Sequence, residues 1–303
     1  MTFTEYCELL ISEAASPACT IYRRNIDNFG YFETSKQNSF VYEFEYLPYY
    51  NELLEKFGLN KIAGKGNQFE KVLSLMQWLT NNTQYCGYSS LTPCVPEEIL
   101  NYSFGKGFSG SINCANKAIL LSDFLMSVGI FALPVWLENF VMDIESDYFC
   151  DGKCHCVVHV YINELNKWIM VDPSFNAYFV DQTNAPLHLV EIANSLQANG
   201  IIKLAQYSLN GTDFFKEKYA DDFVFNTLIF IRCWRGNAFD KRIYDTSCHK
   251  MIPNKLDYIG FLKECYNDDR FSNEQKNFFN ESIKHFNRIF VNEFLLKPQY
   301  RIM

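Results

Sequence analysis

Hydrophobic side chains recur along the chain with two different periods, and each period predicts one kind of secondary structure. In residues 66–85 and 113–128 the apolar positions lie three and four residues apart, as in helices that bury one face. Asn81 and Asn82 are expected to end the first helix, and Gly129 to end the second in a left-handed conformation. Three further helices are expected at 92–104, entered through Pro96, at 188–200, ended by Gly200, and at 272–295, begun by a Ser272–Gln275 capping box.

Other stretches alternate apolar and polar residues or form short apolar runs, and these patterns predict strands. The expected strands are 38–50, which ends at Pro48, then 131–140, 155–162, 168–172 and the buried strand 223–234. Helices therefore come first, a cysteine-bearing helix follows, and mainly antiparallel strands come after it. This order indicates the α+β class rather than a doubly wound parallel sheet.

Cys114 stands at the start of the helix predicted over 113–128. The first turn of a helix has backbone N–H groups without acceptors and the positive end of the helix dipole, so it stabilises a thiolate. Asn113 or Ser111 can cap the helix, and the glycines of 105–110 allow a sharp turn before it. The backbone N–H of Cys114 would also point to where an oxyanion can form.

Two histidines precede an aspartate on a predicted hairpin. His155 and His159 share one strand face, and the opposite face is uniformly apolar, so the histidines face the thiol helix or solvent. A two-residue turn at 163–164 would place His155 opposite Asp172, and a turn two residues later would place His159 there. In either register a carboxylate lies beside an imidazole, in the order Cys, His, Asp that suits nucleophilic catalysis.

The stretches "INCANKAILLSDFLMSVGIFALPVW" and "HCVVHVYINELNKWIMVDPSFN" resemble the transglutaminase-like core of the papain-like cysteine enzymes. In that family a cysteine opens a helix, a histidine begins a strand that reads on to Val–Tyr, and Trp and Asp–Pro follow. The resemblance implies a catalytic triad of Cys114, His155 and Asp172, and the Val–Tyr match favours His155 over His159. His159 replaces the usual glutamate and Val157 the usual aromatic residue.

The resemblance covers about 65–200 and implies a papain-like α+β core in which the thiol helix packs on an antiparallel sheet. Residues 1–64 are then an N-terminal extension packed on this catalytic core, and 201–303 a C-terminal extension within the same globule. The second oxyanion donor is expected upstream of the thiol, with Gln84 and Tyr85 preferred over Asn81 and Trp78. His159 and Trp168 are expected on the cleft wall, His159 as a hydrogen-bonded residue.

Composition narrows the class of partner. A formal net charge of −8 without a Lys/Arg block argues against nucleic acid and anionic membranes. The first residues are acidic, unlike a secretory signal, and no segment has the length of a membrane span.

The 11 cysteines are odd in number and irregularly spaced, which favours reduced thiols in a cytoplasmic protein. Cys150, Cys154 and Cys156 invite a zinc hypothesis, but their C-x3-C-x-C spacing is not a standard knuckle, and no metal or cofactor is predicted.

The leading hypothesis is a cysteine enzyme that hydrolyses a peptide or another amide bond, with a peptide or an amide-bearing small molecule as substrate. One alternative is transfer to an amine, either crosslinking or acetyl-type, which uses the same triad. A second alternative, from a different class, is a catalytically silent binding or scaffold module of the same fold. A third is a zinc-bound structural protein centred on 150–156.

Overall fold

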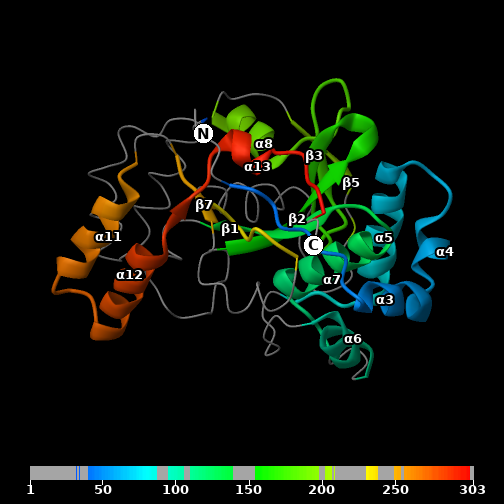
Figure 1. The fold of residues 1–303 in the computed structure, drawn as a ribbon, viewed down its shortest axis with the longest axis horizontal. Helices are drawn as coiled ribbons and strands as arrows, with labels where there is room; N and C mark the ends of the chain where they lie inside the picture. The colour runs from blue at the N-terminus through cyan, green and yellow to red at the C-terminus, as the bar shows by residue number, and fades with distance from the viewer. Residues whose placement is uncertain are drawn as a thin grey trace.

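One six-stranded sheet organises the part of the chain that the structure describes (Figure 1). The computed structural model describes residues 32, 34, 40–86, 95–105, 110–138, 154–197, 202–206, 208, 230–237, 249–253 and 256–300. The strand order is β3-β2-β1-β6-β7-β8, and β4 and β5 form a separate pair. The strands are β1 Ala132–Glu138, β2 Cys154–Ile162, β3 Lys167–Val171, β4 Tyr178–Val180, β5 Lys203–Gln206, β6 Phe230–Cys233, β7 His249–Met251 and β8 Asn287–Arg288. The fold is therefore α+β, as the order of elements predicts.

The sheet is mixed, mainly antiparallel as the order of elements predicts but with one parallel pair, so the core is not a wholly antiparallel sheet. All neighbours from β3 to β7 are antiparallel, but β7 and β8 run parallel. Parallel neighbours need a long crossover, and the helices α11 Tyr258–Asn267 and α12 Asn273–His285 supply it. Strands β6 to β8 come from the last third of the chain, and they extend the sheet that β1 to β3 begin.

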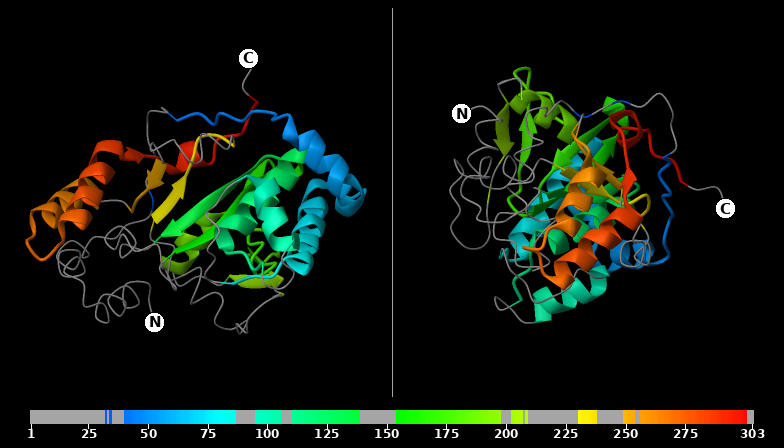
Figure 2. Two further views of the ribbon diagram at one scale, coloured as in Figure 1. Left: turned by 90° about the horizontal axis from the view of Figure 1, so that it is seen from below. Right: turned by 90° about the vertical axis from the view of Figure 1, so that its left-hand side faces the viewer.

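The helix α7, Cys114–Ser127, lies between the sheet and a group of other helices. Figures 1 and 2 show α3 Tyr49–Phe57, α5 Gln68–Asn82 and α6 Pro96–Gly105 around α7, while α11 and α12 lie at the opposite end of the sheet. The short helices are α4 Leu59–Ala63 and α13 Val291–Phe294, and α8 Leu189–Gln197 follows the strand β4. Every residue of α7 after Cys114 is buried, so this helix is the centre of the core rather than a surface helix with one buried face.

Local signals fixed the ends of several helices as predicted. The α5 helix ends at Asn82, α6 begins at Pro96, and Gly129 after α7 has a φ of 79°. Asn113, not Ser111, caps α7, because its side chain accepts a hydrogen bond from the N–H of Asn116. Gly200 and residues 223–229 of the predicted buried strand lie outside the described residues.

The strand predicted over 38–50 is wrong for the described residues 40–47. Phe40, Tyr42 and Phe44 are buried while Val41 is 66% exposed, so the alternation of burial is present. However, Glu43 and Phe44 make only isolated bridges to two separate segments, and no neighbouring strand runs along them. The sequence pattern indicates which side chains are buried. A strand also needs a neighbouring strand to pair with, and the pattern carries no information about that neighbour.

The long helix predicted over 272–295 is also wrong. Its capping box of Ser272 and Gln275 is present, but α12 ends at His285. Residues 287 and 288 instead form β8 against β7, where they bond to backbone groups at the sheet edge. Backbone pairing at that edge outweighs the helical pattern of the side chains.

A buried ion cluster joins the two halves of the sheet. Glu138 on β1 is buried, and its Oε1 lies 2.6 Å from Arg232 Nε on β6 and its Oε2 3.0 Å from Lys250 Nζ on β7. Lys250 also donates to the hydroxyl of Tyr258 on α11 at 3.0 Å. Burial raises the pKa of Glu138, but Arg232 and Lys250 more than offset this and leave it below the ordinary value.

Candidate active site

Cys114 lies at the first position of α7, as predicted. Asn113 and Asn116 form a reciprocal capping box at 3.0 Å and 3.4 Å, which fixes the backbone immediately around the thiol. Gly110 itself lies close to α6, because an added Cβ there would collide with the carbonyl oxygen of Tyr102. Cys114 is only partly buried.

His155 and Asp172 form a buried pair. His155 Nε2 lies 2.5 Å from Asp172 Oδ2, and both side chains are almost fully excluded from solvent. The turn between β2 and β3 has four residues, 163–166, with Asn166 left-handed at φ 48°, and Val158 pairs with Val171. Both predicted registers are therefore wrong, because neither His155 nor His159 lies directly opposite Asp172. Asp172 follows the last pair at Val171, and His155 reaches it along a diagonal of the ladder.

The thiol completes this group. Burial lowers the pKa of His155, but the charge and hydrogen bond of Asp172 and the hydrogen bond and charge of Cys114 raise it to about 10. The Asp172 carboxylate contacts Nε2 of the ring. Because both Asp172 and Cys114 raise the pKa of His155, the three side chains nominated from the sequence lie near one another in the fold.

The turn after β3 holds the carboxylate and a ring beside the pair. Ser174 donates its backbone N–H to Asp172 Oδ1 at 2.8 Å, so both carboxylate oxygens have partners. The ring of Phe175 lies 5.8 Å from that of His155 and 5.1 Å from that of Tyr85. Sequence reasoning gave no role to Ser174 or Phe175, although the Asp–Pro–Ser turn signal was visible.

Among the residues proposed as a second oxyanion donor, Tyr85 is the one whose pKa is affected by the charge of Cys114. Tyr85 is buried and pairs with Ile112, two residues before Cys114. Its pKa is raised by burial, then by the charges of Cys114 and Asp172, so its phenol lies within the field of both.

The other three candidates differ from Tyr85. Gln84 accepts a hydrogen bond from the N–H of Ile112 through its backbone carbonyl, and its side-chain Oε1 is buried without a partner among the described residues. Asn81 is exposed and accepts from Gln77 at 2.8 Å. Trp78 packs 5.9 Å from Phe124, about 15 Å along α7 from the thiol, so its predicted place at the site is wrong.

His159 and Trp168 do not line a cleft with the thiol, which corrects their predicted place. Their rings lie 4.4 Å apart, and the His159 ring lies 4.3 Å from Phe294 on α13. His159 is four residues along β2 from His155, or about 13 Å. Neither of its nitrogens has a hydrogen-bond partner among the described residues, and burial lowers its pKa. His159 is a core residue rather than a hydrogen-bonded wall residue.

Sequence reasoning missed Lys117. This lysine on α7 is fully buried, and its Nζ donates to the carbonyl oxygen of Thr83 at 3.1 Å. Burial lowers its pKa to about 7, although Asp172 and Cys86 oppose the shift. A single charged residue inside the apolar run "ANKAILL" was the signal in the sequence.

The shifts of Lys117 and His155 predict opposite effects of pH on stability. The imidazole of His155 has a pKa of about 10 in the native state, against 6.5 in the unfolded state. Its contribution to the stability of the fold is therefore complete below pH 6.5 and is lost as the pH rises to about 10. The amine of Lys117 has a pKa of about 7 in the native state, against 10.5 in the unfolded state. Its burial therefore destabilises the protein most below pH 7, and this destabilisation decreases as the pH rises towards 10.5. Each slope is at most about 1.4 kcal/mol per pH unit.

Urea unfolding at about pH 7 and about pH 7.6, below the pKa of about 8.5 of unfolded thiols, measures these slopes. Relative to the unchanged protein, Lys117→Met is expected to lose stability as pH rises, because only the imidazole slope remains. His155→Gln is expected to gain stability over the same interval. Parallel pH dependences in all three proteins would contradict both assignments.

The cysteines near the site do not group as a zinc ligand set in the described residues. Cys154 is partly exposed and Cys156 is buried, and both lie on the strand face opposite that of His155, while Cys150 lies outside the described residues. His155 is bonded to Asp172. Within the described ranges no group of three or more His, Cys, Asp or Glu residues is placed to hold a metal ion.

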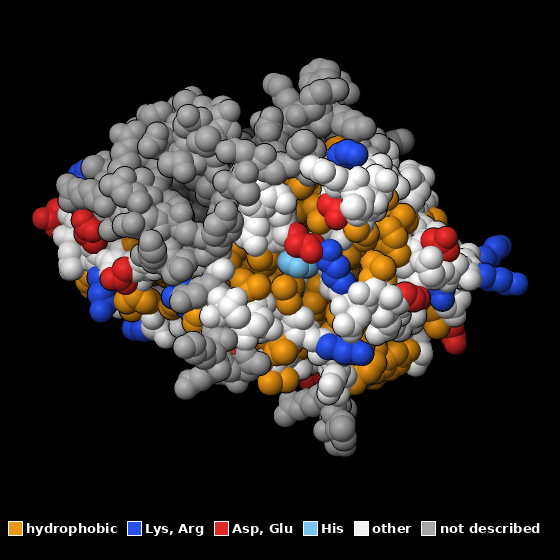
Figure 3. Space-filling view, turned by 90° about the horizontal axis from the view of Figure 1, so that it is seen from above, with side chains coloured by type: hydrophobic (Ala, Val, Ile, Leu, Met, Phe, Trp, Pro, Cys, Tyr) orange, Lys and Arg blue, Asp and Glu red, His pale blue; other side chains and the backbone are white. Residues whose placement is uncertain are grey.

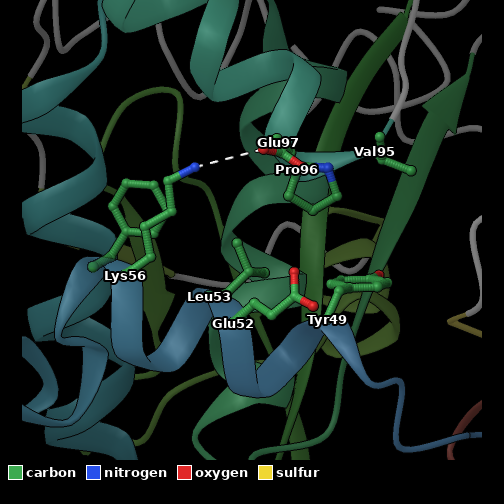
Figure 4. Close-up of a pocket in the computed structure, with 8 residues that line it drawn as sticks. Tyr49, Glu52, Leu53, Lys56, Val95, Pro96 and Glu97 are labelled. Atoms are coloured by element: carbon green, nitrogen blue, oxygen red, sulfur yellow. Dashed lines mark ion pairs between the residues drawn. The ribbon is translucent and has the colours of Figure 1, made fainter.

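A cavity of about 230 Å³ lies between α3 and the start of α6 (Figure 4). Tyr49, Leu53, Lys56, Val95 and Glu97 are among its lining residues, and Lys56 pairs with Glu97 at 3.6 Å across it. No residue of the candidate triad lines this cavity.

Figure 3 shows a face on which basic side chains are scattered among acidic and hydrophobic ones. None of the described helices is long and apolar enough to cross a membrane.

Comparisons of the chain with protein-family models, curated proteins and solved structures find no match. The interpretation of the site therefore rests on its geometry. That geometry consists of a thiol at a helix N-terminus, a buried imidazole and a carboxylate held by a turn, within an α+β fold.

Proposed function

We propose that this protein is a cysteine-dependent acyl-transfer enzyme of the transglutaminase-like class, with Cys114, His155 and Asp172 as its catalytic triad. The preferred reaction is hydrolysis of a peptide or another amide bond. The observation that carries the proposal is the position of His155, which bonds to Asp172 through Nε2 and interacts with Cys114. This is the arrangement that nucleophilic catalysis by a thiol requires.

In the first half of the proposed reaction, the Cys114 sulfur attacks the carbonyl carbon of the amide. His155 is the proton donor, since its raised pKa of about 10 keeps the imidazole charged near neutral pH. Its proton passes to the leaving nitrogen as the C–N bond breaks, and a thioester on Cys114 remains. Asp172 keeps the ring oriented and stabilises its charge through Nε2.

In the second half, the neutral imidazole of His155 takes a proton from water. The resulting hydroxide attacks the thioester carbon, the C–S bond breaks, and the thiolate and charged imidazole are restored with release of a carboxylic acid. The tetrahedral intermediate of each half carries a negative oxygen. The backbone N–H of Cys114, which has no acceptor within the helix, and the hydroxyl of Tyr85 are the donors proposed for it.

The reactivity of Cys114 is the direct test. Under limiting iodoacetamide at about pH 7, Cys114 is expected to be alkylated at least tenfold faster than the other described cysteines, because only it has a charged imidazole and a helix N-terminus beside it. Peptide mass spectrometry after timed quenching measures each rate. The partly exposed Cys86 and Cys154 are the internal controls. Equal labelling of Cys114 and these two thiols would refute the enzyme proposal and favour a silent binding module.

A further inference from the structure

Lys117 is a buried charged residue that the proposed mechanism does not use. It lies three positions after Cys114 on α7, so the two side chains leave neighbouring points of the helix surface. Its side chain is fully excluded from solvent, and its Nζ donates a hydrogen bond of 3.1 Å to the carbonyl oxygen of Thr83. Burying an amine with few compensating hydrogen bonds costs more free energy than burying a methionine side chain of similar size, because the amine loses its hydration. Packing alone therefore gives no reason for a lysine here.

The residue that Lys117 contacts begins the segment that carries Tyr85. Thr83 follows the last residue of α5 as its C-cap, and the chain from 84 to 86 then runs beside the residues that lead into α7. Ile112 donates its N–H to the Gln84 carbonyl at 3.0 Å and accepts from the Cys86 N–H at 3.1 Å. The segment 83–86 is thus held from two directions, by Ile112 before Cys114 and by Lys117 after it.

Tyr85 lies in the middle of this segment and is buried. Its ring packs 5.1 Å from Phe175, which itself packs on His155, and its phenol is within the field of Cys114. A small displacement of the segment would move this hydroxyl relative to the thiol. Hydrogen-bond donors to an oxyanion act only when they are held within a few tenths of an ångström of their working position.

We propose that Lys117 is a positioning residue of the cysteine site, which holds segment 83–86 so that the Tyr85 hydroxyl stabilises the oxyanion formed at Cys114. This inference rests on the proposed function, but it is tested separately. Lys117 touches neither substrate nor sulfur in this role, and it acts through Tyr85. The ammonium also lies in the field of Asp172, and it supplies positive charge to a buried site that holds a carboxylate.

Two reactions of the same thiol separate this role from general activation of the sulfur. With p-nitrophenyl acetate, the sulfur attacks the carbonyl carbon, the carbonyl oxygen takes the negative charge, and p-nitrophenolate leaves to give a thioester. With iodoacetamide, the sulfur displaces iodide from a methylene carbon, and no oxyanion forms. The ratio of the two second-order rate constants therefore reports oxyanion stabilisation, and it cancels changes in thiolate content.

Lys117→Met is expected to lower the rate of acylation by p-nitrophenyl acetate by about tenfold to a hundredfold, while alkylation changes by less than about twofold. Tyr85→Phe, which removes only the hydroxyl, is expected to show the same selective loss. The double variant is expected to lose little more than either single one, because both changes remove one interaction. Lys56→Met, which removes a lysine on α3 paired with exposed Glu97, is the matched control and should leave the ratio unchanged.

An unchanged ratio in Lys117→Met would overturn the positioning role, as would acylation and alkylation that fall together or losses that add fully in the double variant. Unselective labelling of Cys114 in the unchanged protein would instead refute the proposed function itself. Near-UV circular dichroism checks the fold of each variant. If Lys117→Met does not fold, Lys117→Gln replaces it, and its acylation ratio is expected to fall because the shorter amide does not reach Thr83.

Discussion

Replacing His155 with alanine is expected to lower turnover of an amide substrate by about a thousandfold or more, with the fold retained. The imidazole is the proton donor in the first half of the proposed reaction and the base in the second, and it bonds to Asp172 at 2.5 Å. The loss should appear in kcat, because both roles are exerted in the transition states. Release of p-nitroaniline from the best substrate in a panel of blocked dipeptide p-nitroanilides provides the measurement.

His159→Phe is the matched control on the same strand face. Its ring fills the space between Trp168 and Phe294, and no hydrogen bond to either of its nitrogens is present among the described residues. A phenylalanine keeps the packing and removes two buried polar atoms, so turnover should stay within about threefold and stability should be equal or higher. Comparable losses of turnover in the two variants would mean that His155 is not the catalytic imidazole.

Replacing Glu138 with glutamine is expected to destabilise the protein by about 3–5 kcal/mol, the usual consequence of removing one partner from a buried ion pair. The carboxylate lies between Arg232 at 2.6 Å and Lys250 at 3.0 Å, and its loss leaves the almost fully buried ammonium without its counter-charge. Because the cluster joins β1, β6, β7 and α11, we expect a cooperative loss rather than local fraying.

Urea titration gives this change in the free energy of unfolding. Glu281→Gln on α12 is the matched control, since that carboxylate pairs with Lys284 where both side chains are 55% exposed, and its loss should leave the free energy of unfolding nearly unchanged. A change below about 1 kcal/mol in Glu138→Gln would show that the cluster does not hold the strands of the last third to β1.

The candidate triad was visible in the sequence because each member carries a local signal. Cys114 precedes an apolar helix, His155 begins an alternating strand, and Asp172 ends the next strand at a proline. Helix ends were equally legible, since Asn113 and Gly129 act through bonds and backbone angles within a few residues of themselves. Such signals depend on short stretches of chain, so one sequence suffices to read them.

The details that concern more than one segment were not predictable in this way. The β2–β3 register depends on a four-residue turn with a left-handed Asn166, and hydrophobic alternation is equally satisfied by any shift of two residues. The helix α12 stops at His285 because an edge of β7 is available for pairing, which no pattern within 272–295 records.

By itself, the sequence determined the α+β class and the ends of the helices that surround the thiol, because these follow from local periodicity, caps and turn residues. The choice of His155 over His159 for the candidate triad came from the family resemblance, since spacing left both open. The tertiary structure alone decided that His159 is packed between rings, that Trp78 lies away from the thiol, and that Lys117 reaches Thr83. Those outcomes depend on which distant segments share a space, and burial there turns an ordinary lysine into a group with a pKa of about 7.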